Sequence, residues 1–278
     1  MKNVKQIWQE TVKQLEKVYE RRESENITYL LLEDAFSVSK TDILFEAVVE
    51  IASDQLNVYI QKLLQHEPIQ YVTGIADFYG RRFHIEPGAL IPRPETEELV
   101  GLILKENQVQ NPRILDVGVG SGCIALTLAL ELDTQVYGTD VSEEAIAIAR
   151  KNAQQLGAKT QLYHSDILKE DLPESNLDIL VSNPPYIPQK EFDLIAQNVT
   201  WFEPEMALFV PNRDPILFYK RIADAGLNAL KSGGKLYFEI HENFGNEVKT
   251  FLENAGYSEV NIHQDMQGKH RMVSALNG

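Results

Sequence analysis

The most informative stretch of this 278-residue sequence is Ile114-Leu115-Asp116-Val117-Gly118-Val119-Gly120-Ser121-Gly122. Its apolar beginning predicts a buried strand, and its glycines predict a tight turn that opens the next helix. Glycines at such a turn let a ligand approach the backbone closely. The dinucleotide fingerprint would have a further glycine where Cys123 stands, and the Lys-Ser/Thr ending of a P-loop is missing. Because many nucleotide-binding folds use such a loop, the stretch alone does not identify its ligand.

Strands and helices alternate around this stretch, from residue 95 to the C-terminus. This alternation predicts an α/β fold, with a mostly parallel seven-stranded sheet and helices on both of its faces. The predicted strands are Ile114–Val117, Gln135–Gly138, Gln161–Tyr163, Leu177–Val181 and Lys235–Ile240, with closing strands at Val260–His263 and Arg271–Ala275.

The first seventy or so residues differ, because apolar residues recur there at helical spacing only, as at Val4, Ile7 and Leu15. We predict a small all-helical domain over residues 1–74 with a core of its own. Residues 75–94 are expected to form a β-hairpin linker, since turn residues interrupt a short run of alternating apolar side chains. The α/β domain then spans residues 95–278.

Composition limits the classes of function. The net charge is −15 and no run is rich in Lys or Arg, which favours a protein or small-molecule substrate over naked nucleic acid. No apolar run is long enough to span a bilayer, and no targeting signal is expected at the N-terminus. Cys123 is the only cysteine, so an internal disulfide and a cysteine-based zinc site are excluded. We therefore expect no metal site, no membrane contact and a cytoplasmic location.

Two acidic residues follow the next predicted strands along the chain. Asp140 comes after the second strand, where a carboxylate can accept hydrogen bonds from both hydroxyls of a ribose. Asp166 follows the third strand and is placed to accept from an adenine amine. Each of them could instead be a helix N-cap. Three candidate positions at successive strand ends favour a ligand site, because ligands of open α/β sheets bind outside the carboxyl ends of the strands.

A second motif, Ser182-Asn183-Pro184-Pro185-Tyr186, follows the fourth predicted strand. The lone pair of an amide or exocyclic amine nitrogen is delocalised into the neighbouring π-system, so such a nitrogen is a weak nucleophile. Two acceptors in the NH₂ plane would hold both protons and turn the lone pair toward a methyl donor. The Asn183 side-chain oxygen and the Pro184 carbonyl can form that pair, and Tyr186 can lie against the planar group. The alternative is a strand-ending Asn-Pro turn without a chemical role.

Together the two motifs resemble class I S-adenosylmethionine-dependent methyltransferases that act on planar NH₂ nitrogens, a group that includes adenine-N6 DNA methyltransferases. Three further segments resemble the release-factor glutamine N5-methyltransferases (PrmC/HemK family). These segments are His66-Glu67-Pro68-Ile69-Gln70-Tyr71-Val72-Thr73-Gly74, Pro87-Gly88-Ala89-Leu90-Ile91-Pro92-Arg93-Pro94-Glu95-Thr96-Glu97 and Glu203-Pro204-Glu205-Met206-Ala207-Leu208.

The resemblance implies a Rossmann-like class I methyltransferase domain and S-adenosylmethionine as cofactor, with S-adenosylhomocysteine as product. It implies methylation of the glutamine in the Gly-Gly-Gln loop of class I peptide chain release factors, which the helical domain docks. We expect the enzyme to be a monomer. Catalysis falls to Asn183, Pro184 and Tyr186, and glutamine binding to these three and Pro185. The cofactor-binding candidates are Asp116, Gly118, Val119, Gly120, Ser121, Gly122, Asp140, Asp166, Ile167 and Asn183.

The chain departs from the family pattern at three places. The family usually has Arg or Lys at the position of Glu205, and Gly-Gly at the position of Val210-Pro211. An aromatic residue is common where Ile167 stands. The first two departures concern the shape of a loop near the substrate, and the third would weaken stacking on an adenine ring.

Other interpretations stay open at this stage. An adenine-N6 methyltransferase acting on DNA or RNA would share the Asn-Pro-Pro-Tyr chemistry, although it would need a base-flipping pocket and a phosphate-contacting surface. A non-catalytic cofactor-binding adaptor would have no use for two amide acceptors. Arg93 could steer an acidic group of a partner or the cofactor carboxylate, or it could form an ion pair with Glu97 or Glu98.

Overall fold

The structure, a computed structural model, describes residues 3–278, which form two compact units. One unit comprises the described residues up to Ile75 together with the segment Ala196–Phe202. The other comprises Ala76–Ile195 and Glu203–Gly278. The domain limits expected above, 1–74, 75–94 and 95–278, stay a prediction, and residues 1 and 2 of the first domain lie outside the described residues.

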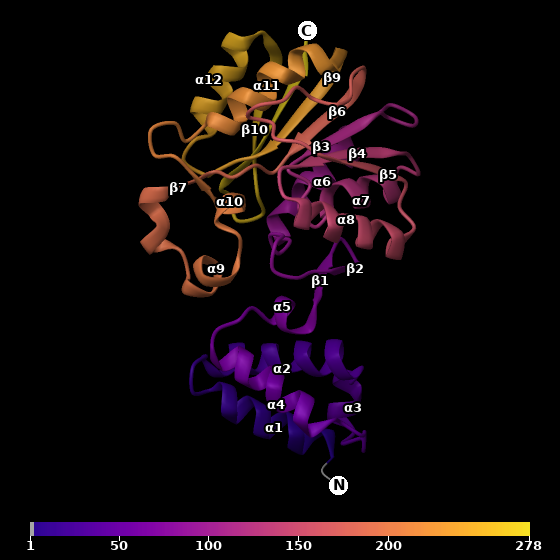
Figure 1. Ribbon diagram of the computed structural model, residues 1–278, viewed down its shortest axis with the longest axis vertical. Helices are drawn as coiled ribbons and strands as arrows, with labels where there is room; N and C mark the ends of the chain where they lie inside the picture. The colour runs from indigo at the N-terminus through magenta and orange to yellow at the C-terminus, as the bar shows by residue number, and fades with distance from the viewer. Residues whose placement is uncertain (1–2) are drawn as a thin grey trace. The chain divides into compact units, whose positions relative to one another are not determined.

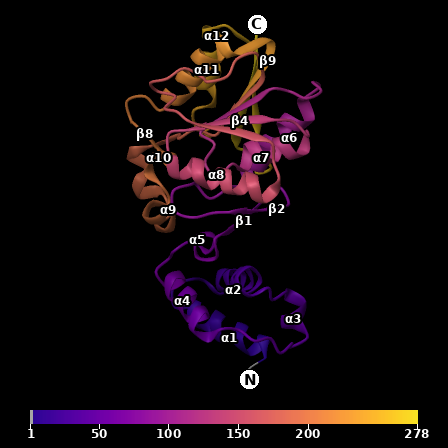
Figure 2. The same cartoon turned by 45° about the vertical axis from the view of Figure 1, so that its right-hand side comes forward.

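The first unit is helical (Figure 2). Two of its helices begin at capping boxes, α1 at Asn3, whose side chain accepts from the Gln6 N–H, and α3 at Ser39, whose side chain accepts from the Asp42 N–H. Their apolar faces meet in a core that includes the fully buried Leu15, Leu31 and Leu63. The helices are α1 (Val4–Leu15), α2 (Arg21–Phe36), α3 (Lys40–Leu44), α4 (Ser53–Leu64), α5 (Ile69–Thr73) and α9 (Gln197–Phe202).

The second unit is built on a seven-stranded sheet, which confirms the predicted number of strands. Its strand order is β10-β11-β9-β6-β3-β4-β5. The strands β9, β6, β3, β4 and β5 are parallel to one another. The strand β11 runs antiparallel to both of its neighbours, β9 and β10. The strands are β3 (Ile114–Val117), β4 (Val136–Asp140), β5 (Thr160–His164), β6 (Leu177–Ser182), β9 (Leu230–Glu239), β10 (Tyr257–Gln264) and β11 (His270–Asn277).

Helices cover both faces of this sheet (Figure 1). One core lies between the sheet and helices α6 (Pro94–Glu106), α7 (Cys123–Glu131) and α8 (Glu143–Leu156). A second core lies between the opposite face and helices α11 (Leu217–Ala229) and α12 (Gly245–Ala255). Strands β3 and β6 are therefore buried on both faces of the sheet, which explains their nearly continuous apolar sequences.

Shorter elements complete this unit. The strands β1 (Ile75–Phe78) and β2 (Arg81–His84) pair as the predicted hairpin. Between β6 and α11 the chain forms β7 (Ile187–Pro188), the 3₁₀ helix η1 (Gln189–Leu194), α10 (Glu205–Leu208) and β8 (Phe209–Val210). Among the described residues, no helix has the length and apolar character needed to cross a membrane.

The parallel arrangement places the carboxyl ends of five strands along one edge of the sheet. The strand order reverses at β3, because β4 follows on one side and β6 lies on the other. This is the switch point at which open α/β sheets bind their ligands. The glycine loop follows β3, Asp140 ends β4, Asn183 follows β6 and Glu239 ends β9.

Candidate active site

A cavity of about 300 Å³ lies at this edge of the sheet. It is lined from the ends of β3, β4, β5 and β6, so the fold brings both sequence motifs to one site. Asp116, Gly122 and Tyr186 are not among its lining residues. The predicted residues that do line it are Gly118, Val119, Gly120, Ser121, Asp140, Asp166, Ile167, Asn183, Pro184 and Pro185.

The glycine loop leaves room for a ligand at its backbone. Gly118 and Gly120 have φ values of 78° and 53°, in the left-handed region that glycine adopts without strain. A Cβ atom at either position would meet no heavy atom within 4 Å, so the space beside these residues is open. The N–H groups of Gly118 and Val119 donate to the Thr139 carbonyl, which ties the loop to β4.

Asp140 joins the glycine loop to the start of α8. Its Oδ2 accepts from the Gly120 N–H at 2.9 Å, and its Oδ1 accepts from the Ser142 N–H at 2.9 Å. Burial raises the pKa of the Asp140 carboxyl above its ordinary value. Each carboxyl oxygen has a second lone pair, so the group can still accept hydrogen bonds from a ligand in the cavity. Ser142, not Asp140, is the N-cap of α8.

Asp166 and Ile167 form the wall that follows β5. The Asp166 Oδ1 accepts from the Leu168 N–H at 3.0 Å, so this residue also closes a turn. Its Oδ2 lies 2.8 Å from the Lys169 ammonium, whose hydrogen bond lowers the pKa of the Asp166 carboxyl. Ile167 lines the cavity while it also packs against the second core of the sheet unit.

Asp116 lies in β3, just before the glycine loop, and is fully buried. Its Oδ2 accepts from the Ala125 N–H in the first turn of α7 at 3.2 Å, and its Oδ1 has no hydrogen-bond partner among the described residues. Burial raises the pKa of Asp116 to about 7. The neighbouring Cys123 thiol has a pKa raised by burial to about 12, so it is not a thiolate nucleophile at neutral pH.

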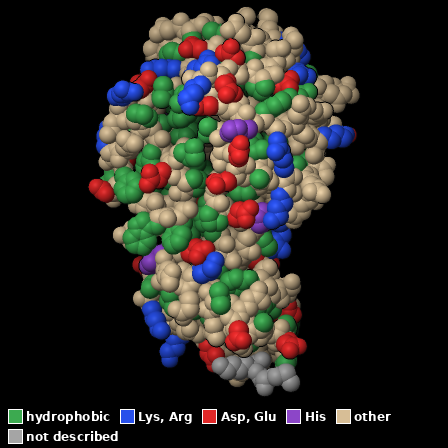
Figure 3. Space-filling model, viewed as in Figure 1, with side chains coloured by type: hydrophobic (Ala, Val, Ile, Leu, Met, Phe, Trp, Pro, Cys, Tyr) green, Lys and Arg blue, Asp and Glu red, His purple; other side chains and the backbone are tan. Residues whose placement is uncertain are grey.

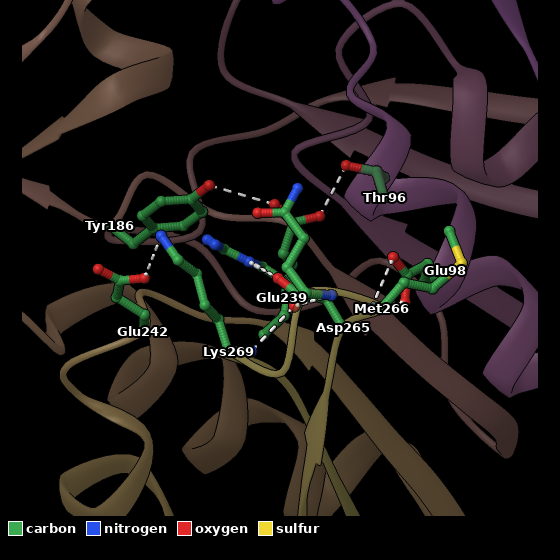
Figure 4. Close-up of polar contacts among 10 residues, drawn as sticks. Thr96, Glu98, Tyr186, Glu239, Glu242, Asp265, Met266 and Lys269 are labelled. Atoms are coloured by element: carbon green, nitrogen blue, oxygen red, sulfur yellow. Dashed lines mark hydrogen bonds and ion pairs between the residues drawn. The ribbon is translucent and has the colours of Figure 1, made fainter.

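The Asn-Pro-Pro-Tyr motif is held by two residues that the sequence analysis did not identify as site residues, Thr96 and Glu239, which Figure 4 shows with Tyr186. The Asn183 side-chain N–H donates to the Thr96 hydroxyl at 3.3 Å, and Tyr186 donates to Glu239 at 3.2 Å. Thr96 in turn donates to Glu239 at 2.6 Å. The carboxylate that follows the apolar run Leu236-Tyr237-Phe238 at the end of β9 was the signal that could have revealed this contact, because buried carboxylates require partners.

Arg93 also lines the cavity, and its ion-pair partner is Glu203 and not Glu97 or Glu98, the alternative partners considered above. Its guanidinium lies 2.6 Å from the Oε1 of Glu203, which is nearly fully buried. The other oxygen of Glu203 accepts from the Ile91 N–H at 3.2 Å, so one carboxylate joins the segment before α6 to the segment before α10. Glu97 accepts instead from the Tyr79 N–H, and Glu98 from the Met266 N–H.

Comparison with known families supports the division seen in the fold. The family described as "Methyltransferase small domain" matches residues 96–201, and the "PrmC N-terminal domain" matches residues 6–74. Two curated relatives carry the name "Release factor glutamine methyltransferase". The one from Bacteroides thetaiotaomicron is 42% identical, over 94% of this chain and 95% of its own length. The one from Flavobacterium psychrophilum is 37% identical with the same coverage of 94% and 95%.

Solved structures share the fold at lower identity. A methyltransferase from Pyrococcus furiosus aligns with a TM-score of 0.54 at 18% identity, over 82% of this chain and all of its own. The 16S rRNA N2 G1207 methyltransferase of Thermus thermophilus, solved with AdoMet and guanosine, also has a TM-score of 0.54 at 18% identity. That alignment covers 73% of this chain and 50% of the other. These likenesses establish the class I methyltransferase fold of the sheet unit.

The geometry of Asp140 predicts a measurable loss of ligand affinity. Replacing Asp140 with Ala removes the candidate acceptor for ribose hydroxyls and frees the Gly120 N–H. We expect S-adenosylmethionine to bind more weakly by about 1–3 kcal/mol, the cost of leaving buried polar groups without partners. Calorimetric titration measures this change, with Asp133→Ala as an exposed control that keeps wild-type affinity. Equal affinities for Asp140→Ala and the unchanged chain would remove Asp140 from the cofactor site.

Proposed function

Because this chain belongs to the release factor glutamine methyltransferase family, we propose that it methylates a release factor on the side-chain amide nitrogen of a glutamine. The methyl group comes from S-adenosylmethionine, and the target is the glutamine of the Gly-Gly-Gln loop of class I peptide chain release factors. One observation carries the proposal. A single cavity joins the open glycine loop and Asp140 to Asn183 and Pro184, at the ends of neighbouring strands.

The residues present suit this cofactor. The backbone beside Gly118 and Gly120 has open space, and Asp140 keeps lone pairs that can accept from two ribose hydroxyls. Asp166 and Ile167 would border the adenine. We assign Asp116 to the support of the loop, because its carboxyl is buried in β3, just before the loop, and bonded to α7. When bound, S-adenosylmethionine supplies an electrophilic methyl group on a sulfonium sulfur.

The chemistry assigned to the protein is positioning. Asn183 Oδ1 and the Pro184 carbonyl each accept one proton of the glutamine NH₂ group, so the lone pair of that nitrogen is turned toward the methyl group. Pro184 and Pro185 have fixed φ angles, which aim the second carbonyl in advance. Tyr186 would border the planar amide. A strong base is unnecessary, because the proton on the nitrogen becomes acidic once the methyl group is attached. Most of the acceleration then comes from holding nitrogen and methyl group in line.

The helical unit is our candidate for recognition of the release factor. One glutamine side chain offers too little surface for specific recognition, since stable protein interfaces bury on the order of 1,200–2,000 Å². The helical unit has its own core, and its sequence matches the family's N-terminal domain. We also propose that the enzyme acts as a monomer in the cytoplasm, without contact to a membrane.

An adenine amine would fit the same pair of acceptors, but charge and family favour a protein substrate. The net charge of −15 opposes binding of a phosphate backbone. Lys and Arg side chains are interspersed with acidic ones on the face shown in Figure 3. A non-catalytic adaptor is disfavoured because Asn183 and Pro184, the two residues that carry the proposed amide acceptors, both line the cavity.

Mass analysis tests the proposed function directly. The chain is incubated with S-adenosylmethionine and a class I release factor, and a parallel reaction contains DNA or RNA. We expect one methyl group per release factor, located by fragmentation on the Gly-Gly-Gln glutamine, and none on the nucleic acid. Methylated adenine with an unmodified release factor would overturn the proposal.

Asn183→Ala should abolish most of the turnover while cofactor binding is retained. The substitution removes one of the two preorganised amide acceptors, so we expect kcat to fall by at least about a hundredfold. Affinity for S-adenosylmethionine, measured by calorimetry, should change far less, because the lost oxygen faces the target amide. Turnover near the wild-type rate would show that the two-acceptor geometry is wrong.

A truncated chain that begins at Phe78 tests the role of the helical unit. It keeps the glycine loop, Asp140 and the Asn-Pro-Pro-Tyr motif. We expect it to bind S-adenosylmethionine. The kcat/KM for the intact release factor should collapse, mainly through a higher KM, because the lost contacts bind the ground state and the transition state equally. Thermal melts with and without cofactor check that the truncated chain is folded. Wild-type kcat/KM in a folded, cofactor-binding truncated chain would contradict the docking role.

A further inference from the structure

Glu239 is a buried carboxyl group placed beside the Asn-Pro-Pro-Tyr motif. It is the last residue of β9, which lies next to β6, and the register of these strands pairs Ser182 with Phe238. Glu239 therefore lies level with the start of the motif, yet only 1% of it is exposed. A charged group in such a place is costly unless it is hydrogen-bonded, so its partners indicate why it is there.

Each oxygen of Glu239 accepts one hydroxyl hydrogen bond (Figure 4). Thr96, in the first turn of α6, donates to Oε2 at 2.6 Å. Tyr186, the last residue of the motif, donates to Oε1 at 3.2 Å. On the other side of Thr96, the Asn183 side-chain N–H donates to the Thr96 hydroxyl oxygen at 3.3 Å. Glu239 thus contacts one end of the motif directly and the other through Thr96.

The direction of these hydrogen bonds is set by chemistry. An ionised carboxylate can only accept, and a threonine hydroxyl has a single proton to give. Because Thr96 gives that proton to Glu239, its oxygen can only accept from Asn183. The Asn183 amide must then turn its NH₂ group toward Thr96, which leaves its Oδ1 free for a ligand. In the opposite orientation, two oxygens without a proton between them would face each other.

We propose that Glu239, acting through Thr96, is a positioning residue that fixes the orientation of the Asn183 amide and holds the Tyr186 hydroxyl. The inference rests on the proposed function, since orientation matters only if Asn183 Oδ1 receives the target N–H. Burial raises the pKa of the Glu239 carboxyl above its ordinary value, and the hydrogen bonds from Thr96 and Tyr186 and the charge of Arg271 oppose that rise.

Two substitutions of Thr96 separate the hydroxyl from the packing of the side chain. Thr96→Val keeps the shape of the side chain but removes its hydroxyl. The Asn183 N–H then loses its acceptor, and the Asn183 amide is free to rotate by 180°. We expect kcat to fall about 10- to 100-fold, as for other small errors of placement, with little change in KM or in affinity for S-adenosylmethionine. Thr96→Ser keeps the hydroxyl and should restore most of the rate. Thr127→Val is the matched control, because Thr127 is buried on α7 and its hydroxyl has no partner among the described residues.

Glu239→Gln tests whether the carboxylate of Glu239 sets the direction of the hydrogen bonds through Thr96. A glutamine offers one acceptor oxygen in place of two, so either Thr96 or Tyr186 loses its acceptor. We expect a loss of kcat similar to that of Thr96→Val, and no further loss when the two substitutions are combined, because both act through Asn183. Melting curves check folding. If Glu239→Gln does not fold, the comparison of Thr96→Val with Thr96→Ser decides the question alone.

The outcomes separate this inference from the proposed function. Wild-type kcat in Thr96→Val, beside an inactive Asn183→Ala, would overturn the positioning role and leave the function intact. Equal losses in Thr96→Val and Thr96→Ser, or losses that multiply in the double variant, would also overturn it, since they indicate packing or independent effects. If the unchanged chain leaves the release factor unmethylated, the proposed function fails and the positioning role falls with it.

Discussion

The site depends on one constraint, which is that parallel strands end at the same edge of a sheet. Because β3, β4, β6 and β9 are parallel neighbours in the sheet, four segments far apart in sequence meet at this edge. Each contributes a different part: the open glycine loop, the carboxyl of Asp140, the acceptors that follow β6, and Glu239. The two helical layers bury the strands on both faces, so these ends are held by a core and not by the loops themselves.

Acidic groups then determine the local shape of the site. Asp140 binds the glycine loop to the start of α8, and Glu203 joins the segment at Ile91–Arg93 to the start of α10. Glu239 connects α6 to the Asn-Pro-Pro-Tyr motif. Each of these carboxyl groups accepts from two donors on different segments. A carboxyl group with two partners in fixed places specifies local geometry, and removal of one partner leaves a polar group unpaired, which destabilises the fold.

Much of this fold follows from local patterns in the sequence. The seven strands and the hairpin were predicted because apolar runs and turn residues report on a few neighbouring positions. The contacts that hold the site were not, because they join residues far apart in the chain: Arg93 and Glu203 are separated by 110 positions, and Thr96 and Glu239 by 143. The sequence also gives no sign that Asp116 is absent from the cavity lining, because β3 is buried on both faces and lacks a polar side.

The central claim is that the site holds a planar amide nitrogen between two oxygen acceptors. A crystal structure of the chain with S-adenosylhomocysteine and a class I release factor tests it most directly. The account predicts that the NH₂ group of the Gly-Gly-Gln glutamine donates to Asn183 Oδ1 and to the Pro184 carbonyl, while the Asn183 NH₂ group donates to Thr96. A target glutamine whose NH₂ group lies away from both oxygens, or an Asn183 amide turned the other way, would contradict it.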